Sequence, residues 1–232
     1  MSSMSLFYDF VCLIYPRLCD ACNASLLQHE EILCTFCQQL LPKTNYHLDE
    51  DNPLARNFWG RVPIAHVAAL YHFKKGGKVQ HLIHQFKYKG ITEIGTYLGE
   101  SYGKDLLQSD FFKDVDVVIP VPLHKRKKRK RGFNQSEIFA KGLSNVMQIP
   151  CDTKTLVRTT ASKTQTKKSR FKRWENVKEI FDITDVVTLK GKHILLVDDV
   201  ITTGATIEAC VNQLLAIPGV KISVAALACT AG

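Results

Sequence analysis

The feature that most constrains the fold is the stretch ILLVDDVITTGAT at residues 194–206. Four consecutive apolar residues, 194–197, predict a strand that is covered on both faces. Two aspartates follow, and a glycine-containing turn then leads into a helix expected over residues 206–216. A buried strand followed by a helix is the unit of a parallel α/β sheet, in which ligands bind at the carboxyl ends of the strands.

The residues at the end of this strand predict a particular ligand. Asp198 and Asp199 suit a diol, because carboxylates repel phosphate but accept hydrogen bonds from hydroxyl groups. The turn offers backbone N–H groups, three hydroxyls and the positive end of a helix dipole, which favour a phosphate. Its residues are Thr202, Thr203, Gly204, Ala205 and Thr206. The combination fits a 5′-phosphorylated ribose, and the alternative is an ordinary strand–turn–helix with a solvated acid pair.

The chain around this stretch also alternates between strand and helix patterns. Further strands are expected at residues 65–73, 115–121, 153–157, 180–184 and 220–228, and further helices at 77–88, 91–107 and 134–147. Asn134 and Glu137 are spaced as a capping box at the start of the last of these helices. The order predicts a parallel sheet flanked by helices.

The amino-terminal part contains four cysteines in the pattern C-x2-C-x11-C-x2-C, namely Cys19, Cys22, Cys34 and Cys37. Paired thiolates at this spacing are typical of a structural Zn²⁺ site, whose four ligands leave no position open for a substrate. Two redox-active CxxC pairs are the alternative, but no βαβ pattern surrounds them. The remaining cysteines lie in apolar surroundings and are expected to be small core residues: Cys12, Cys151, Cys210 and Cys229.

These patterns divide the chain into three segments. Residues 1–41 form the four-cysteine zinc-finger module, in which a short helix over 30–41 carries the second cysteine pair. Residues 42–61 are polar, with several Asn, Asp and Pro residues, and are interpreted as a linker. Residues 62–232 form the α/β domain.

Two groups of motifs carry a family resemblance. Residues 194–206 resemble the phosphoribosyl pyrophosphate (PRPP) motif of type I phosphoribosyltransferases. Residues 118–143, VIPVPLHKRKKRKRGFNQSEIFAKGL, and 165–181, QTKKSRFKRWENVKEIF, resemble the ComF family, as does the four-cysteine module. ComF proteins resemble phosphoribosyltransferases fused to an amino-terminal zinc finger and are associated with DNA uptake in natural competence. The resemblance covers nearly the whole chain apart from residues 42–61.

The resemblance implies a fold and a set of roles. The fold is a type I phosphoribosyltransferase-like parallel sheet flanked by helices, with a small amino-terminal four-cysteine zinc module. Asp198 and Asp199 would bind the ribose hydroxyls, the turn at 202–206 the 5′-phosphate, and Mg²⁺ would accompany the pyrophosphate. The pyrophosphate would face the loop of Val121, Pro122 and Leu123. Residues 159–178 would form a lid whose cations are Lys167, Arg170 and Arg173, although Lys168 stands where an apolar residue is expected.

One local run of cations dominates the charge of the chain. The formal net charge is +9, and the seven residues Lys125, Arg126, Lys127, Lys128, Arg129, Lys130 and Arg131 leave only +2 for the rest. The run is expected to be a loop at the ligand face, and with Phe133, Phe171 and Trp174 it favours single-stranded nucleic acid. A solvated charge run is one alternative. The phosphates of PRPP are another, but a pyrophosphate needs only two or three cations.

A shorter element precedes the second predicted strand. Residues 86–90, FKYKG, also resemble a ComF element and predict a helix that ends at Gly90. His81 and His84 come just before it with a spacing that suits a metal. No third ligand accompanies them, so they are expected to be surface or core residues.

Two hypotheses of function follow. The first is a PRPP or ribose 5-phosphate binding protein that handles single-stranded DNA in DNA uptake, together with DNA-uptake protein partners. The second is an active Mg²⁺-dependent phosphoribosyltransferase with an unidentified acceptor, which needs no protein nucleophile. The amino terminus lacks the basic region and cleavage site of an export signal, and no apolar run approaches the roughly 18 residues of a membrane helix. A cytoplasmic protein without membrane insertion is therefore expected.

Overall fold

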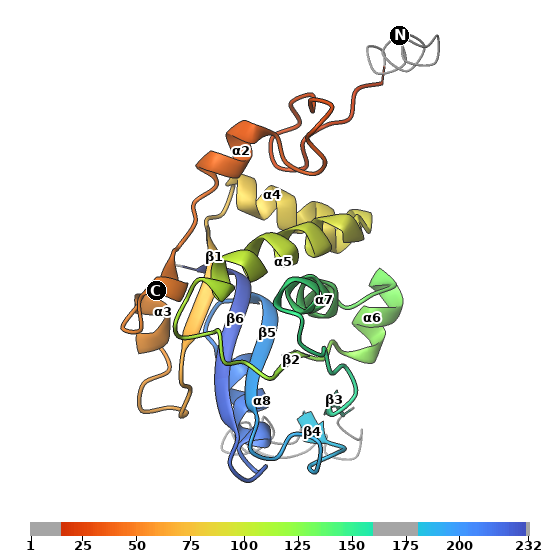
Figure 1. The fold of residues 1–232 in the computed structure, drawn as a ribbon. Helices are drawn as coiled ribbons and strands as arrows, with labels where there is room; N and C mark the ends of the chain where they lie inside the picture. Colours follow the sequence, from red (N-terminus) through yellow and green to blue (C-terminus); the bar gives the residue numbers. More distant parts are fainter. Residues whose placement is uncertain (1–14, 160–180, 231–232) are drawn as a thin grey trace, which may run out of the picture.

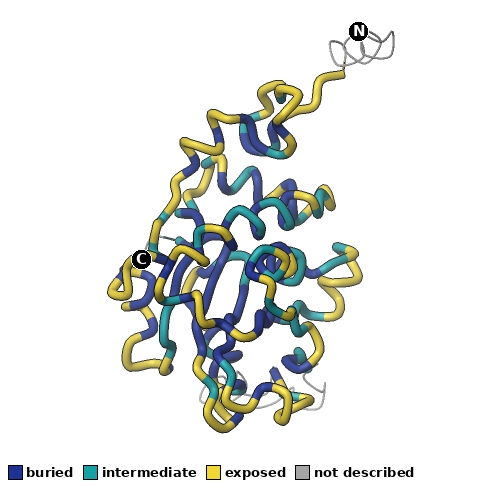
Figure 2. Tube along the Cα trace, in the orientation of Figure 1, coloured by how far each residue is buried: buried dark blue, intermediate teal, exposed yellow. Residues whose placement is uncertain are grey.

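The computed structural model describes residues 15–159 and 181–230. At its centre lies a parallel sheet with the strand order β1-β6-β5-β2 (Figure 1). The strands are β1 (Val67–Phe73), β2 (Val117–Pro120), β5 (His193–Ile201) and β6 (Lys221–Thr230). Eight consecutive residues of β6 are buried, because both faces of the sheet are covered (Figure 2). The predicted α/β sheet is thus confirmed.

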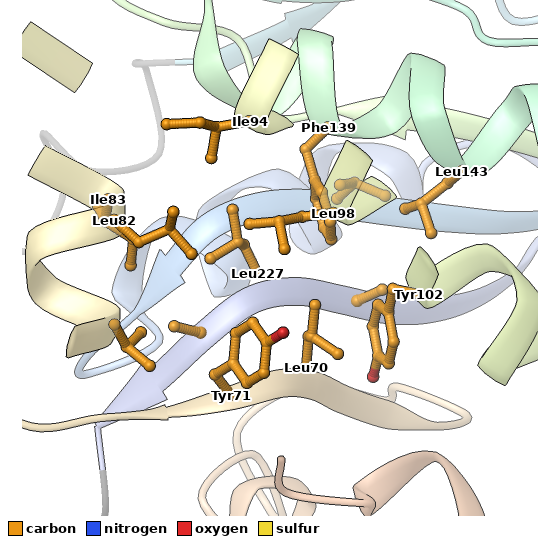
Figure 3. Packing of buried hydrophobic residues seen from close by; sticks show 14 of the residues in the cluster. Leu70, Tyr71, Leu82, Ile83, Ile94, Leu98, Tyr102, Phe139, Leu143 and Leu227 are labelled. Atoms are coloured by element: carbon orange, nitrogen blue, oxygen red, sulfur yellow. The ribbon is translucent and has the colours of Figure 1, made fainter. Parts of the chain in front are cut away.

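One face of the sheet is covered by three helices. They are α4 (Lys78–His84), α5 (Thr92–Leu107) and α7 (Gln135–Met147). Figure 3 shows the core that they enclose with β1 and β6, where Leu98, Tyr102 and Phe139 are fully buried. α5 and α7 approach closely at Gly99 and Gly142, since a Cβ added at Gly99 would lie 2.3 Å from the carbonyl oxygen of Phe139.

The other face packs against two helices from distant parts of the sequence. They are α8 (Ala205–Leu214) and the short α3 (Pro53–Arg56). Both cover the strand side chains that point away from the first core, and along each strand these alternate with the side chains that face the first core. In β5, for example, Leu195 faces the first core and Leu196 faces the second. The alternation follows from the two-residue period of a strand.

The remaining elements lie around this layered core. They are α2 (Thr35–Leu40), the 3-10 turn η1 (Tyr46–Leu48), the π-helix η2 (Gln85–Lys89), α6 (Lys125–Arg131), and an antiparallel pair of β3 (Leu156–Arg158) and β4 (Phe181–Ile183). Among the helices that the structure describes, none combines the length and the apolar character needed to cross a bilayer.

The segment 42–61, expected to be a linker, is packed against the sheet. The Thr44 amide donates to the carbonyl of Leu70 at 3.0 Å, and the His72 amide donates to that of Pro42 at 2.9 Å. Asn52 is buried and caps α3, and it also donates to the carbonyl of Val67 at 2.8 Å. Polar residues here therefore satisfy backbone groups beside β1, while Leu54, Ala55 and Phe58 enter the core.

The outer edge of β2 is covered in a similar way. The amide of Val118 donates to the carbonyl of Pro150, and the amide of Asp152 donates back to the carbonyl of Val118, each at 2.9 Å. Short extended pieces thus lie along both edges of the sheet, 42–44 beside β1 and 150–152 beside β2.

Two local predictions were wrong in detail. The helix expected over 30–41 begins only at Thr35, because the buried Glu30 carboxylate accepts from the Thr35 amide at 2.5 Å and fixes a turn before it. The capping box at α7 does not form: the side chain of Asn134 donates instead to the carbonyl of Val121 at 3.0 Å. Glu137 pairs with Lys128 and Lys141 rather than with the helix terminus.

Candidate functional site

The acid pair lies inside β5, which continues to Ile201 instead of ending at Val197. Asp198 accepts a hydrogen bond from the Ser136 hydroxyl of α7 at 2.9 Å. Asp199 forms an ion pair with Lys87 of η2, whose Nζ lies 2.7 Å from Oδ2. Helices from the first core thus bring one hydroxyl and one cation to the two carboxylates.

The two carboxylates repel one another electrostatically. Burial of its carboxyl group, and next the charge of Asp199, raise the pKa of Asp198 to about 7. The hydrogen bonds from the Asp199 amide and from Ser136, together with the charge of Lys87, act in the opposite direction. The pair therefore depends on a cation or on hydroxyl donors to stay fully ionised near neutral pH.

The turn after β5 surrounds a small hollow of about 30 Å³. The hollow is lined by residues 200–207 and Asp198, so every predicted phosphate-turn residue contributes to it: Thr202, Thr203, Gly204, Ala205 and Thr206. α8 begins at Ala205, and its cap residue Gly204 has no side chain to cap it. The Ala205 amide donates only a long hydrogen bond of 3.5 Å, to Thr203 Oγ1, so the start of the helix can still offer amides to an anion. The turn and the acid pair are therefore adjacent, as the 5′-phosphoribose interpretation requires.

Two residues outside the predicted site hold this turn in place. Gly204 has φ +77°, and a Cβ added there would lie 2.7 Å from the ring of Phe58. Arg61 donates to the carbonyl of Thr203 at 3.2 Å and forms an ion pair with Glu208 of α8 at 2.5 Å. Phe58 and Arg61 both lie near the end of segment 42–61, which was predicted to be a linker from its polar composition.

The loop after β2 approaches the same edge of the sheet. The amide of Val121 donates to the carbonyl of Val197 at 2.8 Å, and Asn134 holds the carbonyl of Val121. Pro122 and Leu123 follow and are half-buried. The predicted lid residues Lys167, Arg170 and Arg173 lie outside the described residues, as do Phe171 and Trp174.

The basic run is a helix, α6, and not the predicted loop. Lys and Arg are good helix formers, and His124 Nδ1 caps the helix by accepting from the Arg126 amide at 3.1 Å. Residues 125–130 are exposed (Figure 2). Within the described part of the chain, Lys128 alone of these seven cations forms an ion pair, with Glu137 at 3.2 Å.

The π-helix η2 connects the basic helix with the acid pair. Lys87 points to Asp199, whereas the next residue, Tyr88, is 61% exposed. The guanidinium of Arg131 lies 5.3 Å from the centre of the Tyr88 ring. The segment ends at Gly90 in a left-handed conformation, as predicted.

The four paired cysteines converge in the amino-terminal module. Their Sγ atoms all lie within 4.8 Å of one another, and Cys22 Sγ and Cys34 Sγ are 3.7 Å apart. Ligands 2.3 Å from a tetrahedral Zn²⁺ are separated by about 3.8 Å, so the four thiols fit one such ion. Of residues 15–159 and 181–230, no other group of three or more His, Cys, Asp or Glu side chains is placed to share a metal, His81 and His84 included.

A buried carboxylate organises the loop between the two cysteine pairs. Glu30 accepts from the Leu27 amide at 2.7 Å and from both the amide and the hydroxyl of Thr35. These hydrogen bonds lower the pKa of Glu30 to about 2. The carboxylate therefore fixes the position of Cys34, which immediately precedes Thr35.

Comparisons with known proteins agree with this arrangement. The family model described as "Phosphoribosyl transferase domain" matches residues 134–231. DNA utilization protein YhgH of Escherichia coli (strain K12) is 29% identical over 201 residues, which are 85% of this chain and 84% of that protein. Competence protein ComFC of Bacillus subtilis (strain 168) is 26% identical over 201 residues, which are 86% and 78% of the two chains. These relatives and the matched domain together support a ComF-family protein with a phosphoribosyltransferase fold.

Solved structures that match this chain include phosphoribosyltransferases. One is a purine phosphoribosyltransferase from Pyrococcus horikoshii, which is 21% identical over 60% of this chain and 73% of that chain, with a TM-score of 0.36. The phosphoribosyltransferase-like α/β fold and the cysteine cluster are the two parts expected of a ComF protein.

Five site residues were not predicted from the sequence: Glu30, Phe58, Arg61, Lys87 and Ser136. Lys87 and Ser136 lie within motifs that carry the family resemblance, at 86–90 and 118–143, whereas the other three had no local signal. Two of the other predicted core cysteines, Cys210 and Cys229, are buried, Cys151 is half-buried, and Cys12 lies outside the described residues.

Proposed function

We propose that this competence-related ComF protein binds PRPP or another ribose 5-phosphate ligand with Mg²⁺, and handles single-stranded DNA on the surface of α6. The observation that carries the first part is the adjacency of the acid pair and the phosphate turn. Asp198 lines the hollow that the turn encloses, so a diol and a phosphate can be held one sugar apart.

Lys87 explains how the acid pair is stabilised without ligand. Its ammonium neutralises Asp199, and ribose hydroxyls would replace it as partners of that carboxylate. Bound Mg²⁺ would supply charge neutralisation at the pyrophosphate, near the loop of Val121, Pro122 and Leu123. Zn²⁺ would have a purely structural role on Cys19, Cys22, Cys34 and Cys37.

We expect Asp199→Asn to lower the affinity for PRPP in the presence of Mg²⁺ at least tenfold. The amide cannot provide the charge-assisted hydrogen bonds that a carboxylate gives to hydroxyl groups. Calorimetric titration measures the effect, and Asp110→Asn provides the control because its exposed carboxylate pairs with Lys113 away from the acid pair. Equal PRPP affinity in wild type and Asp199→Asn would refute the ribose assignment.

The second part of the proposal rests on the unneutralised charge of α6. Among the described residues, Lys128 alone of these seven adjacent cations has an acidic partner. Such a run attracts counterions, which a polyanion would release. α6 contacts η2 through Arg131 and Tyr88, and η2 contacts Asp199 through Lys87, so this charged surface lies next to the proposed ribose site.

A five-residue charge variant tests this part. Changing Lys125, Arg126, Lys127, Arg129 and Lys130 to Gln keeps the contacts of Lys128 and Arg131, and Gln also favours helix. We expect at least a tenfold loss of single-stranded DNA affinity at low salt. The slope of log affinity against log salt concentration should also become less steep, by roughly 0.7 for each phosphate that is no longer neutralised. Fluorescence anisotropy at several salt concentrations measures both.

The matched control removes the same charge elsewhere. Its five Lys→Gln changes are at Lys104, Lys154, Lys190, Lys192 and Lys221; the last three lie at or just before the amino ends of β5 and β6. If both variants lose affinity equally, binding depends on net charge alone and the α6 assignment is wrong.

Phosphoribosyl transfer is the second candidate, and Lys87 favours it. Once displaced from Asp199, a cation at this position would balance the charge of a leaving pyrophosphate. Pyrophosphate release from PRPP in the presence of an acceptor base would favour transfer, whereas binding without release would favour the binding role.

A further inference from the structure

Tyr88 is an exposed aromatic residue in a cationic setting. It is 61% exposed, and two side chains lie against its ring. The ring of His84 lies 4.8 Å from it, centre to centre, at 40°, and the Arg131 guanidinium lies 5.3 Å from its centre. Two side chains thus hold the ring in position while most of its surface stays open.

The contacts of Arg131 fix this arrangement relative to α6. Its Nη1 donates to Oε1 of Gln135 at 2.7 Å, which anchors the guanidinium to the start of α7. The last residue of α6 is therefore held over Tyr88, and the exposed cations of α6 continue from that point. Lys89, the neighbour of Tyr88 in sequence, is exposed as well.

The π-helix explains why an aromatic ring is presented here. The wider turn of η2 directs Lys87 into the ion pair with Asp199 and leaves Tyr88 in solvent. Single π-turns often occur at functional sites because they reorient neighbouring side chains. The π-helix therefore contacts the acid pair through Lys87 and α6 through Tyr88.

We propose that Tyr88, supported by His84, stacks on an unpaired base of single-stranded DNA whose phosphates lie along α6. The proposal rests on the nucleic-acid part of the proposed function and adds the recognition of bases to it. An exposed ring beside a cationic surface is the arrangement by which proteins bind single strands without reading sequence. Base pairs in a duplex are stacked internally, so duplex DNA would engage α6 but not Tyr88.

The test compares Tyr88→Ala with Tyr88→Phe and Tyr88→Leu. We expect Tyr88→Ala and Tyr88→Leu to lose about 5- to 100-fold in affinity for a single-stranded oligonucleotide, and Tyr88→Phe to retain it, because only an aromatic ring stacks. The slope of log affinity against log salt should stay at the wild-type value, since none of these changes removes a cation. Duplex DNA affinity should be the same in all three variants.

An oligonucleotide that contains 2-aminopurine reports stacking directly. Its fluorescence should be quenched by the wild type and by Tyr88→Phe, and should remain unquenched with Tyr88→Leu at saturating protein. Trp59→Ala is the control, because Trp59 is 62% exposed but lines a hollow together with the acidic residues Glu50 and Asp51. It should bind single-stranded DNA as the wild type does.

The outcomes separate the stacking proposal from the function on which it rests. If the α6 charge variant loses affinity while Tyr88→Ala and Tyr88→Leu do not, DNA binds α6 without Tyr88 and the stacking proposal is wrong. If neither the charge variant nor the Tyr88 variants lose affinity, the nucleic-acid function and the stacking proposal both fail. A less steep slope of log affinity against log salt in Tyr88→Leu would show that Tyr88 holds the cations of α6 in position and does not contact a base. That result would also overturn the proposal.

Discussion

Replacing Cys37 with serine is expected to abolish metal binding and unfold the amino-terminal module. Cys37 is fully buried, and it belongs with Leu33 and Leu41 to the part of the first core that the amino-terminal module contributes. Such a small segment gains most of its folding free energy from its metal, and apparent values for structural Zn²⁺ are about 10–16 kcal/mol in isolated zinc-finger peptides. The variant should lose one equivalent of zinc and become sensitive to protease between residues 15 and 41.

Metal analysis after gel filtration measures the first effect, and limited proteolysis with mass spectrometry measures the second. Cys151→Ser is the matched control, because Cys151 is half-buried and lies outside the cysteine cluster. It should keep one zinc per chain. If Cys37→Ser also keeps one zinc per chain, the four cysteines are not the metal ligands.

The second large effect is expected for Gly204→Ala. A side chain at φ +77° costs about 1–2 kcal/mol, and the new Cβ would also lie 2.7 Å from two ring atoms of Phe58. Phe58 is only 2% exposed and is surrounded by the second core, so its ring has little room to move. We expect the free energy of unfolding to fall by about 3 kcal/mol, within the range for overpacked cores together with backbone strain.

Gly132→Ala isolates the backbone contribution. Gly132 has φ +85° at the end of α6, and nothing lies within 4 Å of an added Cβ. Urea denaturation should therefore show a loss of about 1–2 kcal/mol for this control. Gly204→Ala should also weaken PRPP binding, because a displaced turn no longer directs its amides into the hollow. Equal destabilisation in the two variants would mean that Phe58 does not constrain the phosphate turn.

The sequence predicted those parts of the fold in which a local run of apolar residues coincides with a buried element. The apolar run before Asp198 and the final strand are buried on both faces, so composition alone identified them. The phosphate turn was predictable because its residues are contiguous, and the cysteine cluster because its spacing repeats.

The rest depends on contacts between distant residues. Phe58 and Arg61 reach a turn more than 140 residues later in the sequence, and no local signal in a polar segment indicates that pairing. The helix at α6 was not predicted, because the prolines before the run and Gly132 after it indicate a loop. The helix propensity of Lys and Arg and the His124 cap nevertheless form a short helix between them. Lys87 was identified only within a short motif, since its orientation depends on a π-turn that the residue pattern does not indicate.

The pieces of chain along β1 and β2 limit how this protein can associate. Residues 42–44 pair with the Leu70 carbonyl and the His72 amide at the edge of β1, and residues 150–152 pair with both backbone groups of Val118 at the edge of β2. These groups are therefore not open to a second chain. Strand addition to this sheet by another copy or by a peptide would first require one of these pieces to detach. A partner protein should therefore bind through helices, loops or the amino-terminal module, and leave the sheet unextended.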